Sequence, residues 1–367
     1  MSAAPRFIMI GGFLGAGKTT TVARLAEQFR AQGKRIVIVT NDQAADLVDT
    51  LLLRSQGFDV GEVAGSCFCC NFNELTRTVE ALGADNRPDI VLAEPVGSCT
   101  DLVATVIRPL EQIYEHPFEI APYGVIIKPS HGFRILGGGE SRGGFSPKAE
   151  YIFRKQIEEA DFVILNRVDE LSVEEVERIA ELLTREYPDM PVIRMSAKTG
   201  EGFEALCEFL DQRGIFGRRV MDVDYDTYAE GEAELGWLNC QVSLESAADI
   251  ELDTFLLNLL KRLHQELLAM SAEVAHLKVI GLGDGGHGVA NLVSNASRPE
   301  LSLASDYQGK KLNVVVNARV AIDPEQLATL VRAALEKEAM ALGATHTVAS
   351  LASFRPGRPV PTHRLTS

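Results

Sequence analysis

Near its start the chain reads Gly12-Phe13-Leu14-Gly15-Ala16-Gly17-Lys18-Thr19, which matches the phosphate-loop pattern G-x-x-x-x-G-K-[ST]. An apolar run at 7–10 precedes the pattern and an apolar periodicity of helical spacing follows it. A glycine-rich turn arising by chance is the alternative, but the position between a strand and a helix disfavours it. In such a loop backbone N–H groups converge on the β-phosphate at a helix N-terminus, Lys18 reaches the β- and γ-phosphates, and Thr19 offers its hydroxyl to Mg²⁺. The residues expected to contact a nucleotide here are Gly12, Gly15, Ala16, Gly17, Lys18, Thr19 and Thr20.

Further apolar runs alternate with amphipathic helical stretches over the first 215 residues. These runs are 35–40, 89–93, 123–127, 161–165 and 191–195. Ser172 and Glu175 form a capping-box pattern at the start of one helix, and Cys207 lies on the apolar face of another, where we expect it in the core. The alternation predicts an α/β fold: a P-loop NTPase domain with a mostly parallel, doubly wound sheet.

The periodicity fades in an acidic stretch at 216–234, which we interpret as a linker after a domain at 1–215. The order after it is strand, helix, strand, strand, helix, strand, which predicts an α+β, ferredoxin-like βαββαβ domain at 235–356 followed by a tail at 357–367. Asp323-Pro324 marks the start of its second helix. Two glycine-rich stretches, 137–147 and 281–288, are expected to be mobile loops.

The composition limits the possible classes. With 367 residues, about 150 per domain gives two domains, and 46% hydrophobic with 24% charged residues is typical of a globular protein. A formal charge of −15 argues against a broad surface for nucleic acid, which needs Lys and Arg. No apolar run of about 18 residues suggests a membrane span. The early apolar stretch ends in Gly-Lys-Thr-Thr, so we interpret it as part of the fold and expect a cytoplasmic protein.

Two polar motifs directly follow two of the apolar runs. They are Asn166-Arg167-Val168-Asp169 and Ser196-Ala197-Lys198, which resemble the guanine-reading motifs Asn-Lys-x-Asp and Ser-Ala-Lys of GTPases. Because Asp169 can accept from N1 and N2 of guanine together, and adenine has no such donor pair, we expect GTP to be preferred over ATP. Arg167 stands where the motif has Lys, and its planar head can also stack on a base. The alternative for Asp169 is a helix cap.

Acidic residues near other strand ends are candidates for magnesium binding and catalysis. Glu94 can hold a magnesium-bound water, and Gly97 can donate its N–H to the γ-phosphate. Asp42 or Asp49 can complete the magnesium shell or orient the attacking water, with helix capping as the alternative for both.

Three cysteines fall within four positions, Cys67-Phe68-Cys69-Cys70. Three thiolates satisfy most of a tetrahedral Zn²⁺ shell and also suit Co²⁺ or Cu⁺, with the fourth ligand from elsewhere in the chain, from water or from a partner. An incomplete shell is what metal transfer requires. The alternatives are a redox switch or reactive thiols without a metal.

The phosphate loop, the Glu-x-x-Gly element at 94–97 and Cys-x-Cys-Cys together resemble the CobW-type GTPases, relatives of UreG, HypB and MeaB, over about the first 215 residues. The resemblance implies a SIMIBI-class GTPase that couples nucleotide state to delivery of a metal, or of a metal cofactor, to a client protein. It also implies nucleotide-dependent dimers, metal carried by Cys67, Cys69 and Cys70, and Glu62 as a minor ligand. The family includes zinc chaperones, proteins of cobalamin synthesis and activators of nitrile hydratase.

The chain departs from this family at three places. Lys128-Pro129-Ser130 stands where an Asp is usual, Asn41-Asp42-Gln43-Ala44 is nearer to UreG, and Gly65-Ser66 precedes the first cysteine where Gly alone is usual.

One face of the second sheet is expected to carry polar side chains. Its residues are Asn239, Gln241, His276, Lys278, Asn313, Asn317 and Arg319. A solvated face is the plain interpretation, since antiparallel sheets often face water on one side. The alternative is a client-docking surface with His276 as a transient metal ligand.

The resulting hypothesis is a magnesium-dependent GTPase and metallochaperone that transfers zinc or cobalt to a client metalloprotein. We expect slow hydrolysis by the chain alone, because no arginine finger is evident. We expect the γ-phosphate to order the segment from Asp42 to Cys70 and so to tighten the metal site. The competing hypotheses are a GTP-dependent chaperone of a cobalamin or corrinoid enzyme, and a thiol-redox GTP switch.

Overall fold

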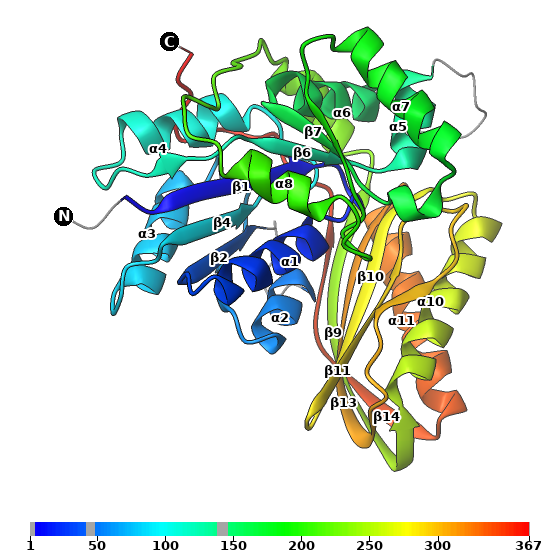
Figure 1. The fold of residues 1–367 in the computed structure, drawn as a ribbon. Helices are drawn as coiled ribbons and strands as arrows, with labels where there is room; N and C mark the ends of the chain where they lie inside the picture. Colours follow the sequence, from blue (N-terminus) through cyan, green and yellow to red (C-terminus); the bar gives the residue numbers. More distant parts are fainter. Residues whose placement is uncertain (1–3, 42–47, 138–145, 367) are drawn as a thin grey trace. The chain divides into compact units, whose positions relative to one another are not determined.

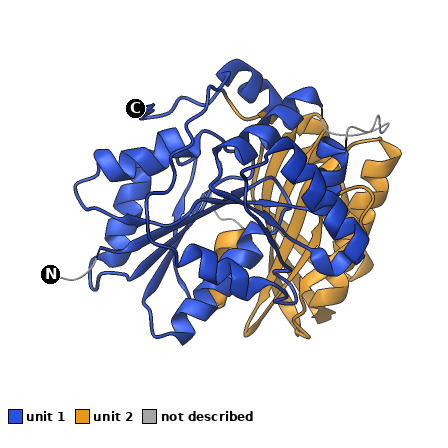
Figure 2. Ribbon diagram, turned by 45° about the horizontal axis from the view of Figure 1, so that its top comes forward, with its two compact units in different colours: residues 1–45, 57–231, 358–367 blue, residues 46–56, 232–357 orange. Residues whose placement is uncertain are grey.

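The computed structural model describes residues 4–41, 48–137 and 146–366. The chain forms two compact units (Figure 2). The first comprises residues 1–45, 57–231 and 358–367, and the second comprises 46–56 and 232–357. The expected linker contains a helix, α9 (Tyr225–Glu232). That 1–215 and 235–356 fold as separate domains stays a prediction.

The first unit is built on a parallel sheet with the strand order β3-β2-β4-β1-β6-β7-β8 (Figure 1). A short strand, β5, also pairs with β1, and every strand pair is parallel. The strands are β1 (Arg6–Gly12), β2 (Ile36–Asn41), β3 (Asp59–Val63), β4 (Ile90–Glu94), β5 (Glu119–Ile120), β6 (Gly124–Ile127), β7 (Phe162–Leu165) and β8 (Val192–Arg194). This sheet confirms the predicted α/β class, and the phosphate loop follows its central strand.

Helices follow most of these strands. They are α1 (Lys18–Ala31), α3 (Phe72–Gly83), a π-helix η1 (Val103–Ile107), α4 (Arg108–Gln112), α5 (Pro129–Leu136), α6 (Pro147–Glu159), a 3₁₀ turn η2 (Val168–Glu170), α7 (Val173–Glu186) and α8 (Phe203–Leu210). The Ser172 and Glu175 capping box is formed at the start of α7. Cys207 is buried on the inner face of α8, so its predicted core position is confirmed.

The second unit is an antiparallel sheet with the order β12-β11-β10-β13-β9-β14. Its elements are β9 (Gly236–Glu251), α10 (Leu252–Ala269), β10 (Val274–Gly283), β11 (Gly286–Leu292), β12 (Glu300–Leu303), β13 (Gln308–Val320), α11 (Pro324–Ala341) and β14 (Ala344–Phe354). The series β9-α10-β10-β13-α11-β14 is the predicted βαββαβ arrangement, and β11 and β12 add a hairpin at one edge. Leucine and valine side chains from α10, α11 and one face of the sheet form its core.

The expected loop at 281–288 is instead a β-hairpin. Gly281 pairs with Gly288 and Gly283 with Gly286, so only Asp284-Gly285 turns the chain. Gly285 has φ +96°, a conformation that glycine adopts without strain. The glycines led to the prediction of a loop because they lack apolar side chains. Their backbones nevertheless pair between β10 and β11. The other expected loop, 137–147, lies almost wholly outside the described residues.

Helix α2 (Val48–Ser55) packs on part of the polar face of the second sheet. This helix belongs to the second unit although the chain places it between β2 and β3. Val48 packs on Ile280, Val289 and Val315, and its N–H donates to Asn317 Oδ1 at 3.0 Å. The expectation of a solvated face is therefore wrong for the part around Asn317, which is buried beneath apolar contacts of α2, whereas Asn313 of the same strand is exposed.

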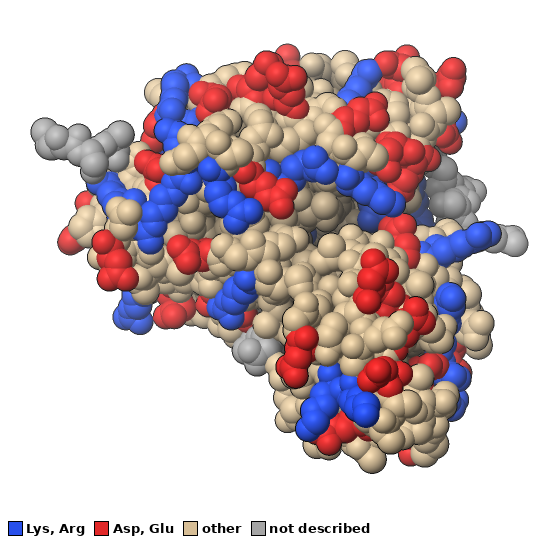
Figure 3. Space-filling model, turned by 60° about the horizontal axis from the view of Figure 1, so that its bottom comes forward, with Lys and Arg blue, Asp and Glu red and all other residues tan. Residues whose placement is uncertain are grey.

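Charges are mixed over the molecular surface. On the face drawn in Figure 3, Lys and Arg side chains lie among Asp and Glu side chains. Within the described ranges, no helix is long and apolar enough to span a membrane.

Candidate functional site

The phosphate loop adopts a backbone that only glycine fits at two positions. Gly12 has φ +130°, and a Cβ there would lie 2.3 Å from the carbonyl oxygen of Ile126. Gly17 has φ +101°, and a Cβ would lie 2.3 Å from Asn166 Nδ2. Lys18 turns back over the loop and donates to the Gly12 carbonyl at 3.0 Å. The shape of the loop therefore depends on glycine at these two positions.

The loop after β4 contacts the phosphate loop. Thr19 Oγ1 donates to Glu94 Oε1 at 2.8 Å, and both side chains are buried. A Cβ on Gly97 would lie 2.9 Å from Lys18 Nζ. Glu94 and Gly97 therefore lie against the two residues expected to meet Mg²⁺ and the γ-phosphate.

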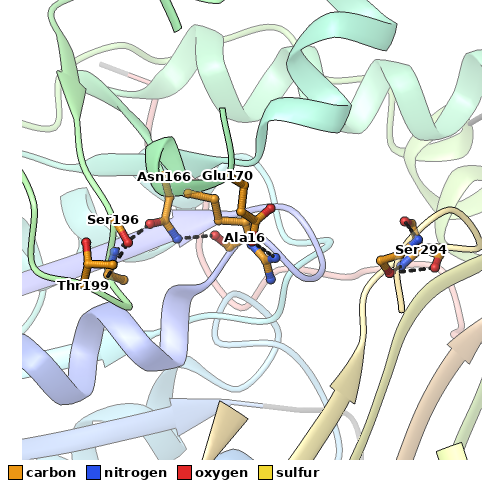
Figure 4. A network of polar contacts seen from close by, with 9 residues as sticks. Ala16, Asn166, Glu170, Ser196, Thr199 and Ser294 are labelled. Atoms are coloured by element: carbon orange, nitrogen blue, oxygen red, sulfur yellow. Dashed lines mark hydrogen bonds and ion pairs between the residues drawn. The ribbon is translucent and has the colours of Figure 1, made fainter. Parts of the chain in front are cut away.

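Asn166 ties the phosphate loop to the second polar motif (Figure 4). Its Nδ2 donates to the Ala16 carbonyl at 2.8 Å, and its Oδ1 accepts from Ala197 N at 2.9 Å. Ser196 Oγ accepts from Thr199 N at 3.0 Å and so shapes the turn that carries Ala197. The two predicted base-reading motifs and the phosphate loop thus meet at one end of the sheet.

Arg167, Asp169 and Lys198 lie on the outer side of this network. Arg167 has φ +64°, and its guanidinium pairs with Glu170 at 2.8 Å. Asp169 is exposed in η2, and Lys198 is exposed as well. The N-cap of α7 is Ser172, so Asp169 does not serve as the cap of that helix.

Two acidic candidates remain, Asp42 and Asp49. Asp42 is outside the described residues. Asp49 is in α2 of the second unit, where its carboxylate pairs with Lys278. The role predicted for Asp49 at magnesium stays a prediction.

The three cysteines form a tight cluster in the turn between β3 and α3. The Sγ atoms of Cys67 and Cys69 are 2.8 Å apart, those of Cys67 and Cys70 are 3.2 Å apart, and those of Cys69 and Cys70 are 3.7 Å apart. Among the described His, Cys, Asp and Glu residues these three make the one group suited to a metal ion, so Glu62 and His276 are not part of it. A Zn–S bond of about 2.3 Å places two thiolates of a tetrahedral site about 3.8 Å apart. The cluster fits one ion after opening by less than about 1 Å.

The thiols of Cys67 and Cys70 have pKa values shifted in opposite directions. Hydrogen bonds from Cys69, Cys70 and Cys99 hold the pKa of Cys67 well below its usual range. The same contact with Cys67 raises the pKa of Cys70 to about 11. Of these two thiols Cys67 therefore loses its proton the more readily, and the thiolate is the form that binds a metal.

Asn41 holds the cysteine turn in place, and the sequence analysis assigned it no such role. Its Nδ2 donates to the carbonyls of Val63 and Ser66, each at 2.8 Å, and its Oδ1 accepts from Phe68 N at 2.7 Å. Asn41 ends β2, and the residue before it, Thr40, is paired with Glu94 of β4. The thiol cluster is thus fastened to a strand that neighbours the strand bearing Glu94.

Two further features near the cluster have no sequence motif. Cys99, 2% exposed, lies five residues beyond Glu94 and contributes to the lowered pKa of Cys67. The segment 358–366 also belongs to the first unit, and Val360 N donates to Cys70 Sγ at 3.3 Å. Thr362 bonds to the carbonyls of Cys69 and Cys70, each at 2.8 Å. A periodic apolar pattern in residues 358–366 could have predicted that this segment packs on the cysteine turn, but the segment has no such pattern.

A family model, CobW/HypB/UreG nucleotide-binding domain, matches residues 6–194, just over half of the chain. The chain belongs to the CobW/HypB/UreG family. Among curated proteins it is 26% identical over 209 residues to the zinc chaperone CobW of Pseudomonas aeruginosa, covering 49% of this chain and 53% of that protein. It is 25% identical over 227 residues to the urease accessory protein UreG of Metallosphaera sedula, covering 57% and 96%. The chain thus spans about half the length of the CobW relative.

Solved structures of two relatives also align with this member of the CobW/HypB/UreG family. HypB from Helicobacter pylori in complex with nickel aligns with a TM-score of 0.40 at 19% identity, covering 56% of this chain and 86% of that one. Zn(II)-bound YjiA GTPase from E. coli aligns with a TM-score of 0.38 at 15% identity, covering 92% and 99%.

Proposed function

We propose that this family member is a GTPase that couples its nucleotide state to binding a thiophilic metal, zinc or cobalt, and to passing it to a client metalloprotein. The observation that supports it most is the pairing of Thr40 with Glu94. One strand end leads to Asn41 and the cysteine turn, and the neighbouring strand end carries the carboxylate bonded to Thr19. A conformational change at the nucleotide site or at the cysteine turn would therefore act on the neighbouring ends of β4 and β2.

In this proposal the phosphate loop and the loop after β4 hold the triphosphate. Lys18 and the Gly97 N–H contact the γ-phosphate, while Thr20 and the glycines shape the cradle. Thr19 and Glu94 present oxygen atoms 2.8 Å apart at the start of α1, and oxygen donors of this kind suit Mg²⁺. When bound, Mg²⁺ neutralises phosphate charge during hydrolysis.

Guanine is selected by the network around Asn166. Asp169 is exposed where a base would lie beside Ala197, and a carboxylate there accepts from both N1 and N2 of guanine. Lys198 and Arg167 flank the base, and release of Arg167 from Glu170 would let its head stack. Equal binding of a fluorescent guanine nucleotide and its adenine counterpart would contradict this selection.

The metal is cargo, held by Cys67, Cys69 and Cys70 and taken up as each thiol releases its proton. Anaerobic titration of the metal-free protein with Co²⁺ tests this, because thiolate-to-cobalt charge-transfer bands appear only when sulfur binds. We expect bands in the wild type and none in the Cys67/Cys69/Cys70→Ser variant. Bands that persist in the variant, or are missing from the wild type, would refute the assignment.

A thiol-redox switch is the second candidate, favoured by the 2.8 Å approach of Cys67 to Cys69. A mild oxidant would then change GTP affinity in metal-free protein, and the change would reverse with a thiol reductant. Nucleotide-dependent dimers and slow hydrolysis without a client belong to the same proposal and are measured by sedimentation and phosphate release.

A further inference from the structure

We infer that a strip of hydrogen-bond acceptors beside the cysteine turn is a docking site for an extended, basic segment of the client protein. This acceptor strip consists of the backbone carbonyls of Cys69, Cys70 and Ala104 and the carboxylate of Asp101. Residues 358–366 of this chain lie on the acceptor strip in the structure, and a client segment would take their place. The inference rests on the proposed function, because the partner is the client, and it adds the surface that the client contacts.

The segment lies on the strip much as a bound peptide would. Thr362 donates its N–H to the Cys69 carbonyl and its hydroxyl to the Cys70 carbonyl, each at 2.8 Å. The N–H of Leu365 donates to the Ala104 carbonyl, also at 2.8 Å. Two of these three donors are backbone groups and the third is a hydroxyl, which a serine also supplies. Another segment with a suitable backbone can therefore repeat these contacts.

The carboxylate of Asp101 selects a cationic side chain. It is 1% exposed, and its Oδ2 accepts from Arg364 Nε and from the Tyr225 hydroxyl, each at 2.7 Å. Its Oδ1 is buried and has no hydrogen-bond partner in the described part of the chain. Because charge-assisted hydrogen bonds are about twice as strong as neutral ones, a guanidinium is the ligand that this carboxylate favours. The segment recognised by the strip therefore carries an Arg two residues after a Thr or Ser.

The backbone of Asp101 adds a second sign of a binding site. Asp101 has φ +63°, a conformation that residues other than glycine rarely adopt. Such strained residues cluster at sites where a ligand is held. The strain keeps the carboxylate directed at the guanidinium of Arg364, whose Nη2 also donates to the Met221 carbonyl at 2.8 Å.

The sequence of the segment favours an extended backbone before it binds. Pro359 and Pro361 fix φ at about −65°, and residues that precede a proline avoid the helical region. Residues 358–366 accordingly contain no helix or strand. Val360 is 70% exposed, and its N–H donates to Cys70 Sγ at 3.3 Å. The strip thus contacts the backbone of this position, and a client segment in the same place would lie beside a metal ligand.

Covalent attachment gives the chain's own segment an advantage over a free one. A tethered segment competes at an effective concentration on the order of millimolar. A client segment therefore displaces residues 358–366 when the client also contacts the chain elsewhere, or when the hold of residues 358–366 on the strip is weakened. Arg364→Ala provides that weakening, because it removes the contact with Asp101 and leaves the strip intact.

Fluorescence anisotropy of a labelled synthetic peptide with the sequence of residues 356–366 tests the docking site on the whole chain. We expect this peptide to bind the Arg364→Ala protein at least about tenfold more tightly than the wild type, because the weakened segment competes less. Arg358→Ala, which breaks an exposed pair with Asp226, is the matched control and should bind the peptide like the wild type. A peptide with Ala at the position of Arg364 should bind the Arg364→Ala protein at least about tenfold more weakly.

Equal binding of the two peptides, or binding of neither, would overturn the inference and show that residues 358–366 are a fixed part of the fold. Thr362→Val, at an exposed position, removes one donor to the strip and takes the place of Arg364→Ala if circular dichroism shows that variant to be unfolded. Thiolate-to-cobalt bands without peptide binding would leave the proposed function intact and refute the docking site alone. Absence of these bands from the wild type would refute the proposed function and the client role of the strip with it.

Discussion

The side-chain amide of Gln156 donates to the backbone carbonyl of Cys99 at 2.8 Å, inside the first unit. Through a second bond to Gly97 the same amide holds the loop that follows Glu94. Helix α6 thereby acts as the fixed support of a loop that contacts the phosphate loop at one end and the thiol cluster at the other. The proposed coupling between the nucleotide and the metal is expected to depend on this attachment.

Replacing Gln156 by Leu should weaken that support. The change leaves two buried carbonyl oxygens without their donor, and we expect it to lower the free energy of unfolding by about 1–3 kcal/mol. It should also reduce the difference in Co²⁺ affinity between the GTP-analogue and GDP states. Gln212→Leu, at an exposed side chain, is the control. Urea unfolding and paired Co²⁺ titrations measure both effects, and an unchanged affinity difference would argue against the loop as the coupling element.

Asp169 should determine the choice of base. Asp169→Ala removes a charged acceptor for two guanine donors, so GTP affinity should fall about tenfold to a hundredfold while the weak binding of ATP stays the same. Glu181→Ala removes an exposed carboxylate of α7 to which no role at the base is assigned, and it serves as the control. Fluorescence titration with labelled nucleotides checks this. Equal losses of affinity for GTP and ATP would show that Asp169 has a structural role and does not contact the base.

Arg364 should keep the segment 358–366 over the cysteine turn. Its Nε donates to Asp101 Oδ2 at 2.7 Å, and the Asp101 side chain is 1% exposed. Arg364→Ala should cost about 1.5–3 kcal/mol of stability and speed the reaction of Cys70 with a thiol reagent. Arg358→Ala breaks the exposed pair with Asp226 in the same segment and should change little. Equal Cys70 reactivity in the two variants would show that the segment does not shield the cluster.

Glu159 should make stability depend on pH. Burial raises its pKa to about 8 from an ordinary value of 4.5, so between these values the folded protein holds a proton that the unfolded chain lacks. Its contribution is present below pH 4.5 and is lost as pH rises to 8, by at most about 1.4 kcal/mol per pH unit.

Glu159→Gln should therefore flatten the stability profile and gain most over the wild type above pH 8. Unfolding in urea at pH 5, 6.5 and 8.5 measures the difference. Glu158→Gln, one residue away in a half-buried pair with Lys155, should leave the slope unchanged. A wild-type slope that survives in Glu159→Gln would assign the dependence to another group.

Sequence reasoning succeeded where a motif or a period is local. The phosphate loop, the capping box at Ser172 and the parallel strands that are apolar throughout are confirmed, because each is specified within a few residues. Strand β3 was missed since Asp59 and Glu62 interrupt its apolar pattern, and an edge strand tolerates such residues. The three-cysteine cluster was predicted as a group because its members are adjacent.

What sequence reasoning could not find depends on long-range packing. Asp49 is a carboxylate close to a strand end in the sequence, and we therefore predicted it near magnesium. The sequence gives no sign that its helix packs on the second sheet, where Asp49 pairs with Lys278. Cys99 is a single thiol in sequence, and its effect on the pKa of Cys67 arises only in the folded chain. Asn41 shows no sign of its three hydrogen bonds to the cysteine turn until β2 and β3 are paired.

The central claim, that GTP hydrolysis opens the metal site, is tested most directly by a single-turnover experiment. Protein loaded with Co²⁺ and GTP is given Mg²⁺ in the presence of a chelator, and thiolate-to-cobalt absorbance and phosphate release are followed together. We predict that the absorbance decays at the rate of phosphate release and persists with a nonhydrolysable analogue. Loss of the absorbance at the same rate with GTP and with the analogue would contradict the account.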